Sequence, residues 1–164
     1  FEEKRFKNEI KFIEEQKPLG TSGALSKLQN INSKKIFVTN CDTIINYDIN
    51  KIIDHHAKNK NSLTILVVRK KYSIPYGIFH ENKNNKSINM IEKPKLNYLI
   101  NIGSYVINKK CLKLLKKNKR YDFNNFVKIL EDNNEKIGLY KISEKSWKDV
   151  GTWNEYRRTV SLMK

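Results

Sequence analysis

The sequence has few cysteines and no long apolar run. Its two cysteines, Cys41 and Cys111, stand far apart, without a second sulfur at the spacing of a metal site. No apolar segment follows a basic start at Phe1, and together these absences argue against disulfides and secretion. The longest apolar runs, such as residues 63–68, are far shorter than the roughly 20 residues that a membrane span needs. We therefore expect a cytoplasmic protein without membrane contact.

Acidic residues are also scarce, with 17 Asp and Glu against 33 Lys and Arg and a formal net charge of +16. Such a charge would suit a nucleic-acid partner. The lysines, however, occur in almost every segment rather than in one stripe interleaved with aromatic residues. A nucleic-acid binder is therefore the hypothesis we rank last, and the positive field would equally favour a small phosphate-bearing substrate.

What the chain does contain is a series of short apolar runs, within 38% apolar and 30% charged residues. This composition is typical of a folded globular chain. Its 164 residues fit one domain, 1–164.

In the first 70 residues, strand patterns alternate with helix patterns. Strands are expected at 9–15, 34–40 and 62–70, and helices after Thr21 or Ser22 and after Asp48. Such a repeat implies parallel strands joined by right-handed crossovers.

The second half begins with a hairpin pattern, because two strand-like runs at 76–80 and 87–93 are separated by a polar turn at 81–86. A longer strand pattern follows. The remaining expected elements are a strand at 97–108, helices at 109–117 and 122–133, a strand at 136–142 and a helix at 152–163.

Two aspartates stand where a strand is expected to end. Asp42 follows the strand at 34–40, and Asp149 precedes a Gly–Thr turn into the last helix. Ligands gather at the carboxyl ends of parallel strands, and a rigidly held carboxylate there suits Mg²⁺. An aspartate at such a place is also typical of a turn or a helix cap, so the residues alone leave both interpretations open.

Between the two aspartates, residues 75–79, 91–94 and 101–105 each put a glycine or a charged pair beside a strand. Glycine permits close approach of a ligand to the backbone. Glu92 offers an acceptor for sugar hydroxyls, and Lys93 offers a cation for phosphate. Taken singly, each motif is equally typical of a surface turn or a bulge.

Taken together and in this order, the motifs resemble one family, the sugar-1-phosphate nucleotidyltransferases, and within it the mannose-1-phosphate guanylyltransferases. The resemblance covers essentially the whole chain, and the ordered set is far more specific than any single motif. It implies a Rossmann-like three-layer α/β sandwich with a mixed, mainly parallel sheet, the glycosyltransferase-A-like nucleotidyltransferase fold. The matching stretches are PLGTSGAL (18–25), NCD (40–42), PYGI (75–78), EKP (92–94), NIGSYV (101–106) and WKDVGTWNEY (147–156).

The resemblance also implies roles for individual residues. The metal Mg²⁺ would be held by Asp42 and Asp149, which with Lys93 form the catalytic set. The nucleotide base and ribose would be bound by Gly20, Thr21 and Gly23. The sugar phosphate would be surrounded by Tyr76, Gly77, Glu92, Lys93 and Asn101.

The implied reaction is attack of a sugar-1-phosphate on the α-phosphorus of a nucleoside triphosphate, which gives a nucleotide sugar and pyrophosphate. GTP and mannose-1-phosphate are favoured, and the product would serve polysaccharide synthesis. Members of the family commonly form homo-oligomers. The alternative is a non-catalytic module of the same fold that senses nucleotides or sugar phosphates.

The chain departs from the family pattern at two places. The family begins with a glycine-rich triphosphate loop, whereas the first glycine here is Gly20. We therefore expect a C-terminal part of the domain that lacks its first strands and is inactive on its own. Cys41 stands where the family has glycine, and we expect it to be small and buried. We expect Trp147 and Trp153 to pack the last helix onto the sheet rather than to stack on a base.

Overall fold

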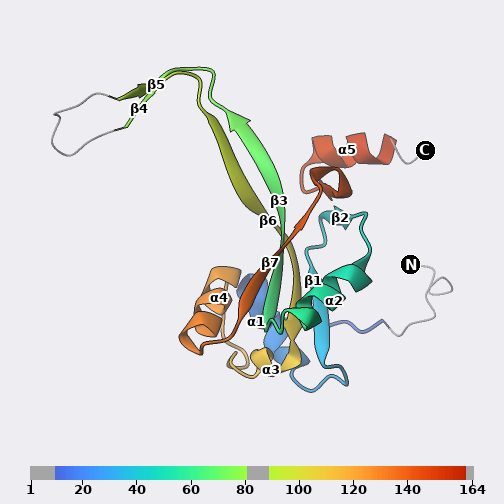
Figure 1. The fold of residues 1–164 in the computed structure, drawn as a ribbon. Coiled ribbons are helices and arrows are strands. Elements are labelled where there is room, and N and C mark those ends of the chain that lie inside the picture. The colour runs from blue at the N-terminus through green and yellow to red at the C-terminus, as the bar shows by residue number, and fades with distance from the viewer. Residues whose placement is uncertain (1–9, 81–88, 162–164) are drawn as a thin grey trace.

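The computed structural model describes residues 10–80 and 89–161, and its centre is a four-stranded sheet (Figure 1). The strand order is β1-β6-β3-β7. β6 is antiparallel to β1 and β3, whereas β7 is parallel to β3. Three strands of this mixed sheet therefore run in one direction, as expected. Their bounds are Lys35–Thr39 for β1, Leu63–Ser73 for β3, Lys95–Asn108 for β6 and Ile137–Ile142 for β7.

The order of the strands differs from a simple crossover repeat. β1 and β3 are joined through helix α2 (Ile49–Lys58), but β6 lies between them in the sheet. The two strands run in the same direction without pairing, because each uses its inner edge for β6. Pairing of neighbouring parallel strands in the first 70 residues is therefore absent from the described part of the chain.

Two short two-stranded sheets accompany the central one. β2 (Thr43–Ile45) pairs antiparallel with β8 (Trp147–Asp149). β4 (Ile78–Phe79) pairs antiparallel with β5 (Met90–Ile91), which confirms the expected hairpin. The expected turn at 81–86 lies outside the described residues. Figure 1 shows β4 and β5 at the end of a long arm formed by β3 and β6, away from the body of the molecule.

Apolar side chains fill both faces of the central sheet. On one face, Phe126 of α4 (Phe123–Asp132) packs with Leu63 and Ile107. On the other face, Ile52 of α2 packs with Leu66 and Val106. Ile107 and Val106 are neighbours in β6 and point to opposite faces, as the period of two in a strand requires. The helices thus cover both faces, which confirms the expected three-layer arrangement.

The sequence explains where these helices begin. The Asp48 side chain accepts a hydrogen bond from the Asn50 amide at the start of α2. At the start of α4, Asp122 and Asn125 form a reciprocal capping box. The other helical segments are α1 (Gly20–Gly23), η2 (Ala24–Leu28), α3 (Lys109–Leu112), η3 (Glu144–Ser146) and α5 (Trp153–Ser161).

Two expected elements are wrong, and a third starts earlier than expected: the helix predicted after Thr21 or Ser22 begins at Gly20, with Leu19 at the cap position. Residues 10–15 form no strand, since they lack a partner within the described chain, and Phe12 is 95% exposed. The helix expected at 109–117 ends as α3 at Leu112 and continues as turns. No helix within residues 10–80 and 89–161 is long and apolar enough to cross a membrane.

Candidate functional site

Asp42 and Asp149 lie side by side although they are far apart in the sequence. Asp42 directly precedes β2, and Asp149 ends β8. The antiparallel pairing of these strands places Asp149 opposite Thr43. The Val150 amide also donates a hydrogen bond of 2.9 Å to the Asp42 carbonyl. The two aspartates are therefore held by the backbone of one small sheet. We call them the carboxylate pair.

Gly151 lies between the two carboxylates. A methyl group added to its Cα would lie 3.0 Å from Asp42 Oδ2 and 3.1 Å from Asp149 Oδ1. The Gly151 amide donates to Asp149 Oδ1 at 2.9 Å, which orients that carboxylate. The two side chains therefore converge on the same point, and only a residue without a side chain leaves that point open.

The carboxylate pair fits a hard divalent cation. Mg²⁺ binds few protein carboxylates and takes its other oxygen ligands from water and from substrate phosphates. No three His, Cys, Asp or Glu side chains gather closely enough to hold a metal ion anywhere in the described chain, so the pair itself offers a cation two carboxylates and no third such ligand. Asp149 is exposed and Asp42 is half-buried, so a ligand can reach both.

Behind the pair, Asn40 and Gly103 join β1 to β6. The Asn40 amide donates to the Gly103 carbonyl at 3.0 Å, and the Asn40 side chain packs on the Cα of Gly103. Gly103 has a φ of +72°, and its amide donates to Asn101 Oδ1 at 3.0 Å. Asn101 in turn donates to the Tyr105 hydroxyl, and burial raises the pKa of that phenol. Asn101 is thus hydrogen-bonded to Gly103, the residue on which the Asn40 side chain packs, and it is not among the residues of the β4–β5 hairpin.

Gly20, Thr21 and Gly23 are contacted by the chain itself. Gly20 has a φ of +76° and lies against Tyr121 and Asp122, while Gly23 lies against Leu19 and the Lys119 carbonyl. Thr21 Oγ1 accepts a hydrogen bond of 2.9 Å from the first amide of α4, that of Phe123. The ring of Phe123 stacks on Tyr105 of β6. These contacts give the glycine-containing segment a packing role.

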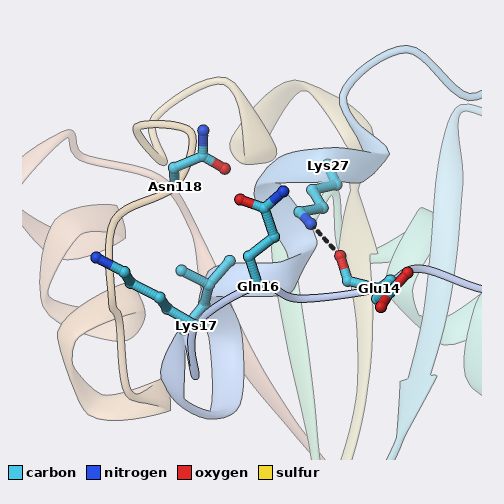
Figure 2. A pocket seen from close by; sticks show the side chains of 6 residues that line it. Glu14, Gln16, Lys17, Lys27 and Asn118 are labelled. Atoms are coloured by element: carbon cyan, nitrogen blue, oxygen red, sulfur yellow. Dashed lines mark hydrogen bonds between the residues drawn. The ribbon is translucent and has the colours of Figure 1, made fainter.

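A cavity of about 580 Å³ opens beside the same segment (Figure 2). Leu19 lies at its wall, and Lys27 donates a hydrogen bond to the Glu14 carbonyl across one side. Its other lining residues are Gln16, Lys17 and Asn118. The structure thus provides space next to the predicted nucleotide-binding segment, with two lysines near it.

Four of the predicted sugar-phosphate residues lie at the end of the arm. Tyr76 is 73% exposed, and a methyl group on Gly77 would lie 3.0 Å from Glu92 Oε2. Lys93 forms an ion pair of 3.8 Å with Glu92. The hairpin brings these residues together, but Figure 1 shows it far from β2, the strand that pairs with β8. The structure therefore does not place Lys93 beside the carboxylate pair.

The expectations for Cys41 and Trp153 are wrong, because both residues are exposed. Cys41 lies in the loop between β1 and β2. Trp153 is 75% exposed at the start of α5. Trp147, in contrast, packs against the apolar cluster on the α2 face of the sheet, which confirms the part of the expectation that concerns the sheet.

Asn40 and Gly151 are candidate residues of the functional site that sequence reasoning did not select. Both lie inside quoted motifs, residues 40–42 and 147–156. The available signal was their position, each two residues along the chain from a predicted metal ligand. Their contacts to Gly103 and to the two carboxylates could be seen only in the fold.

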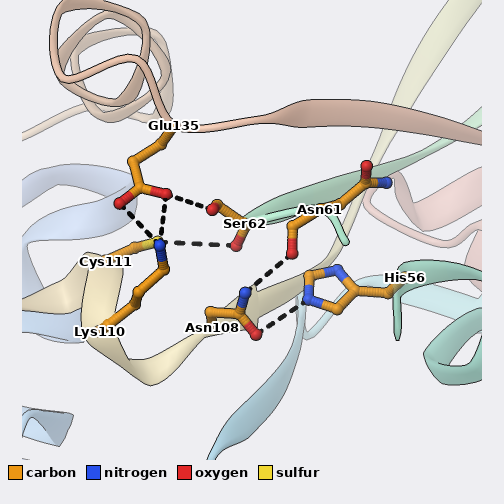
Figure 3. Close-up of polar contacts among 7 residues, drawn as sticks. All are labelled: His56, Asn61, Ser62, Asn108, Lys110, Cys111 and Glu135. Atoms are coloured by element: carbon orange, nitrogen blue, oxygen red, sulfur yellow. Dashed lines mark hydrogen bonds and ion pairs between the residues drawn. The ribbon is translucent and has the colours of Figure 1, made fainter. Parts of the chain in front are cut away.

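Two histidines, His55 and His56, are neighbours in α2, and their rings have different surroundings: His55 packs edge-on against Tyr140, whereas His56 makes polar contacts. His56 is buried, and its Nε2 lies 3.1 Å from Asn108 Oδ1 (Figure 3). Because Asn108 Nδ2 donates to the Asn61 carbonyl, Asn108 Oδ1 must accept, and His56 Nε2 carries the proton. His56 Nδ1 then accepts from the Thr64 hydroxyl at 2.8 Å. Both ring nitrogens are satisfied by a neutral imidazole.

Comparison with known proteins places these features in a family. A family model described as nucleotidyl transferase matches residues 1–163. The chain is 30% identical to mannose-1-phosphate guanyltransferase 2 of Candida glabrata, over 98% of this chain and 46% of that protein. It is 31% identical to mannose-1-phosphate guanylyltransferase catalytic subunit beta of Drosophila melanogaster, over 68% of this chain and 31% of that protein.

A solved structure has a similar fold. HddC from Yersinia pseudotuberculosis, complexed with GMP-PN, matches 93% of this chain and 66% of its own chain. The TM-score is 0.65 and the sequence identity is 25%. The chain spans less than half the length of the two curated relatives named above.

Proposed function

The chain belongs to the nucleotidyl transferase family, and from this membership we propose that its protein transfers a nucleotidyl group to a sugar-1-phosphate. The donor is a nucleoside triphosphate, and the products are a nucleotide sugar and pyrophosphate. GTP and mannose-1-phosphate are the favoured substrates, since the relatives are named for that reaction. Residues 1–164 are proposed to form part of one nucleotidyltransferase domain of a cytoplasmic protein, whose product serves polysaccharide synthesis.

The convergence of Asp42 and Asp149 beside Gly151 carries this proposal. Two phosphate-bearing substrates repel each other, so their alignment requires a positive group between them. The carboxylate pair would hold Mg²⁺, which when bound neutralises charge on phosphate oxygens. The small sheet of β2 and β8 fixes both carboxylates in advance, so that little reorganisation is needed when substrates bind.

The remaining assignments follow from the family resemblance. Gly20, Thr21 and Gly23 are proposed to lie near the nucleotide, beside the cavity of Figure 2. The sugar phosphate is proposed to bind Asn101 near the pair and the hairpin residues Tyr76, Gly77, Glu92 and Lys93. In this scheme Lys93 supplies a positive charge to the sugar phosphate.

The test is turnover of the protein that contains this chain, measured as pyrophosphate release from GTP and mannose-1-phosphate with Mg²⁺. Asp42→Asn and Asp149→Asn keep the shape of each side chain but remove its charge. We expect each to lower kcat by more than about 100-fold, because loss of a group that only orients a metal ligand already costs 10- to 100-fold. Asp54→Asn, on the exposed face of α2, is the matched control with unchanged kcat.

Normal turnover in both variants would show that the pair does not hold the metal. If the unaltered protein binds GTP and the nucleotide sugar but turns over no combination of nucleoside triphosphate and sugar phosphate, the sensing module is the correct alternative. Melting temperatures of the variants, which we expect to be close to that of the parent protein, exclude loss of the fold as the cause.

A further inference from the structure

We propose that the end of the central sheet at which β1 and β3 begin carries an anion site, in which Lys35, Lys60 and Lys110 bind the phosphate group of a small molecule. The site is separate from the carboxylate pair. A ligand there takes no part in the proposed reaction, and its binding does not depend on that proposal.

The first observation is a cavity of about 310 Å³ at this end of the sheet. Lys35 is the first residue of β1, and its partner in the register is Asn108, the last residue of β6. Both residues line the cavity. The carboxylate pair lies beyond the other end of β1, and the strand from Lys35 to Thr39 alone spans roughly 13 Å, at about 3.3 Å per residue. A ligand in this cavity is therefore out of reach of a metal ion at the pair.

The second observation is the charge of the lining. Lys35 of β1, Lys60 in the turn after α2 and Lys110 of α3 all line the cavity, and no described Asp or Glu does. Lys110 forms an ion pair of 2.8 Å with Glu135, outside the lining. Lys35 and Lys60 form no ion pair with any described residue. Two lysines from separate segments therefore bring uncompensated positive charge to one hollow.

Asn108 adds a neutral donor to the lysines. Its Oδ1 accepts from the buried His56 ring, and its Nδ2 donates to the Asn61 carbonyl at 2.8 Å (Figure 3). An amide nitrogen carries two N–H groups, and the second of Asn108 has no partner among the described residues. Because both ring nitrogens of His56 are already bonded, the ring holds Asn108 in this orientation and leaves the anion to the lysines.

The arrangement suits a tetrahedral oxyanion. Phosphate oxygens point in several directions, so ammonium groups that arrive from three segments can each meet a different oxygen. A planar carboxylate is better matched by the fork of an arginine, and no described arginine lines the cavity. The volume of about 310 Å³ also leaves room for a small organic group attached to the phosphate.

Lys60 also stands where the backbone favours glycine. Its φ is +53°, just after the end of α2, a position at which helices commonly have glycine. The Lys60 side chain recovers none of this conformational cost through an ion pair with a described residue. Lys60→Gly therefore removes the charge and relieves the backbone in one change.

The experiment follows the NMR signals of the His56 ring in the protein that contains this chain, at pH 7.5, while inorganic phosphate replaces chloride at constant ionic strength. We expect the signals to shift and the shift to saturate. Lys60→Gly and Lys35→Gln should each raise the dissociation constant for phosphate about three- to tenfold. Lys60→Gly should leave the melting temperature unchanged or higher, which excludes loss of the fold as the cause. Lys51→Gln, which removes one charge at an exposed position near the other end of α2, is the matched control with the dissociation constant of the parent protein.

A parallel titration with glycerol phosphate identifies the source of the phosphate group. Tighter binding than that of inorganic phosphate would assign the site to a phosphomonoester, and equal or weaker binding would assign it to inorganic phosphate. The site would be refuted by a shift that does not saturate, or by dissociation constants in Lys60→Gly and Lys35→Gln equal to that of Lys51→Gln. Turnover is no part of this readout, so failure of the proposed function would leave the result unchanged.

Discussion

At the scale of single residues, glycine is required at positions 103 and 151 for two different physical reasons. Gly103 adopts a φ of +72°, which side chains rarely adopt, and the Asn40 side chain covers it. Gly151 is not in that region of backbone conformation. The carboxylate oxygens of Asp42 and Asp149 border the space that a side chain at this position would need. The first glycine is required by the backbone and the second by the neighbouring carboxylates.

Substitution by alanine should therefore affect a different property at each glycine: stability at Gly103 and turnover at Gly151. Gly103→Ala should lower the free energy of unfolding by about 1–3 kcal/mol, because the added methyl group strains the backbone and displaces Asn40. Gly151→Ala should leave the free energy of unfolding within about 0.5 kcal/mol of the parent and abolish most turnover, because the methyl group displaces the carboxylates. Urea unfolding and pyrophosphate release measure the two effects. Equal losses of stability in both variants would contradict this assignment.

Protonation of His56 provides a pH-dependent contribution to stability. Burial lowers the pKa of His56 below its ordinary value of 6.5, and the nearby charges of Lys35 and His55 act in the same direction. The stabilisation is therefore fully present above pH 6.5 and is lost as the pH falls through the lower pKa of the folded state. Protonation would also put a second donor on a ring whose Nδ1 accepts from Thr64.

We expect the free energy of unfolding, measured in urea, to decrease between pH 7 and pH 5. His56→Gln should show a flatter dependence on pH, although its stability at pH 7 will be lower because a buried ring is lost. His80→Gln, at an exposed position, is the control with the dependence of the parent protein. A His56 ring that titrates at or above pH 6.5 in NMR spectra would contradict the expectation.

At the scale of elements, the sequence predicts most long segments correctly, and the reasons are local. The aspartates at 48 and 122 mark the starts of α2 and α4, and apolar periodicity marks the rest of each helix. β3, β6 and β7 follow from their apolar runs. The strand expected at 10–15 fails because alternation of apolar residues does not by itself supply a partner strand.

The pairing of β2 with β8 could not be predicted, since each has only three residues and the two are about one hundred positions apart. The position of β6 between β1 and β3 could not be predicted either. An apolar run indicates a strand, but it does not indicate which neighbouring strands will pair with it. The candidate site therefore rested on the resemblance. Its ligand types were visible in the residues, while the meeting of Asp42 and Asp149 was not.

At the scale of the whole molecule, the net charge of +16 should oppose compactness. The ion pairs of the described residues mostly join exposed side chains, such as Lys128 and Asp132, and exposed pairs compensate little of this repulsion. Screening should therefore stabilise the protein.

We expect the melting temperature to rise when NaCl is increased from about 10 mM to about 150 mM, since the screening length falls from about 30 Å to about 8 Å. Differential scanning fluorimetry measures the change, and a neutral osmolyte at matched osmolality is the control. A constant or falling melting temperature would show that attractive pairs outweigh the excess of positive charge.

The central place of β6 has a consequence for synthesis of the chain. β6 ends at Asn108 and is hydrogen-bonded to both β1 and β3, so neither of those strands has its antiparallel partner until the ribosome has made residue 108. Until then, nascent chains carry two unsatisfied strand edges. Chains arrested before residue 95 should therefore recruit holding chaperones most strongly, and release should be complete only in chains extended past residue 142, in which β7 has also paired with β3.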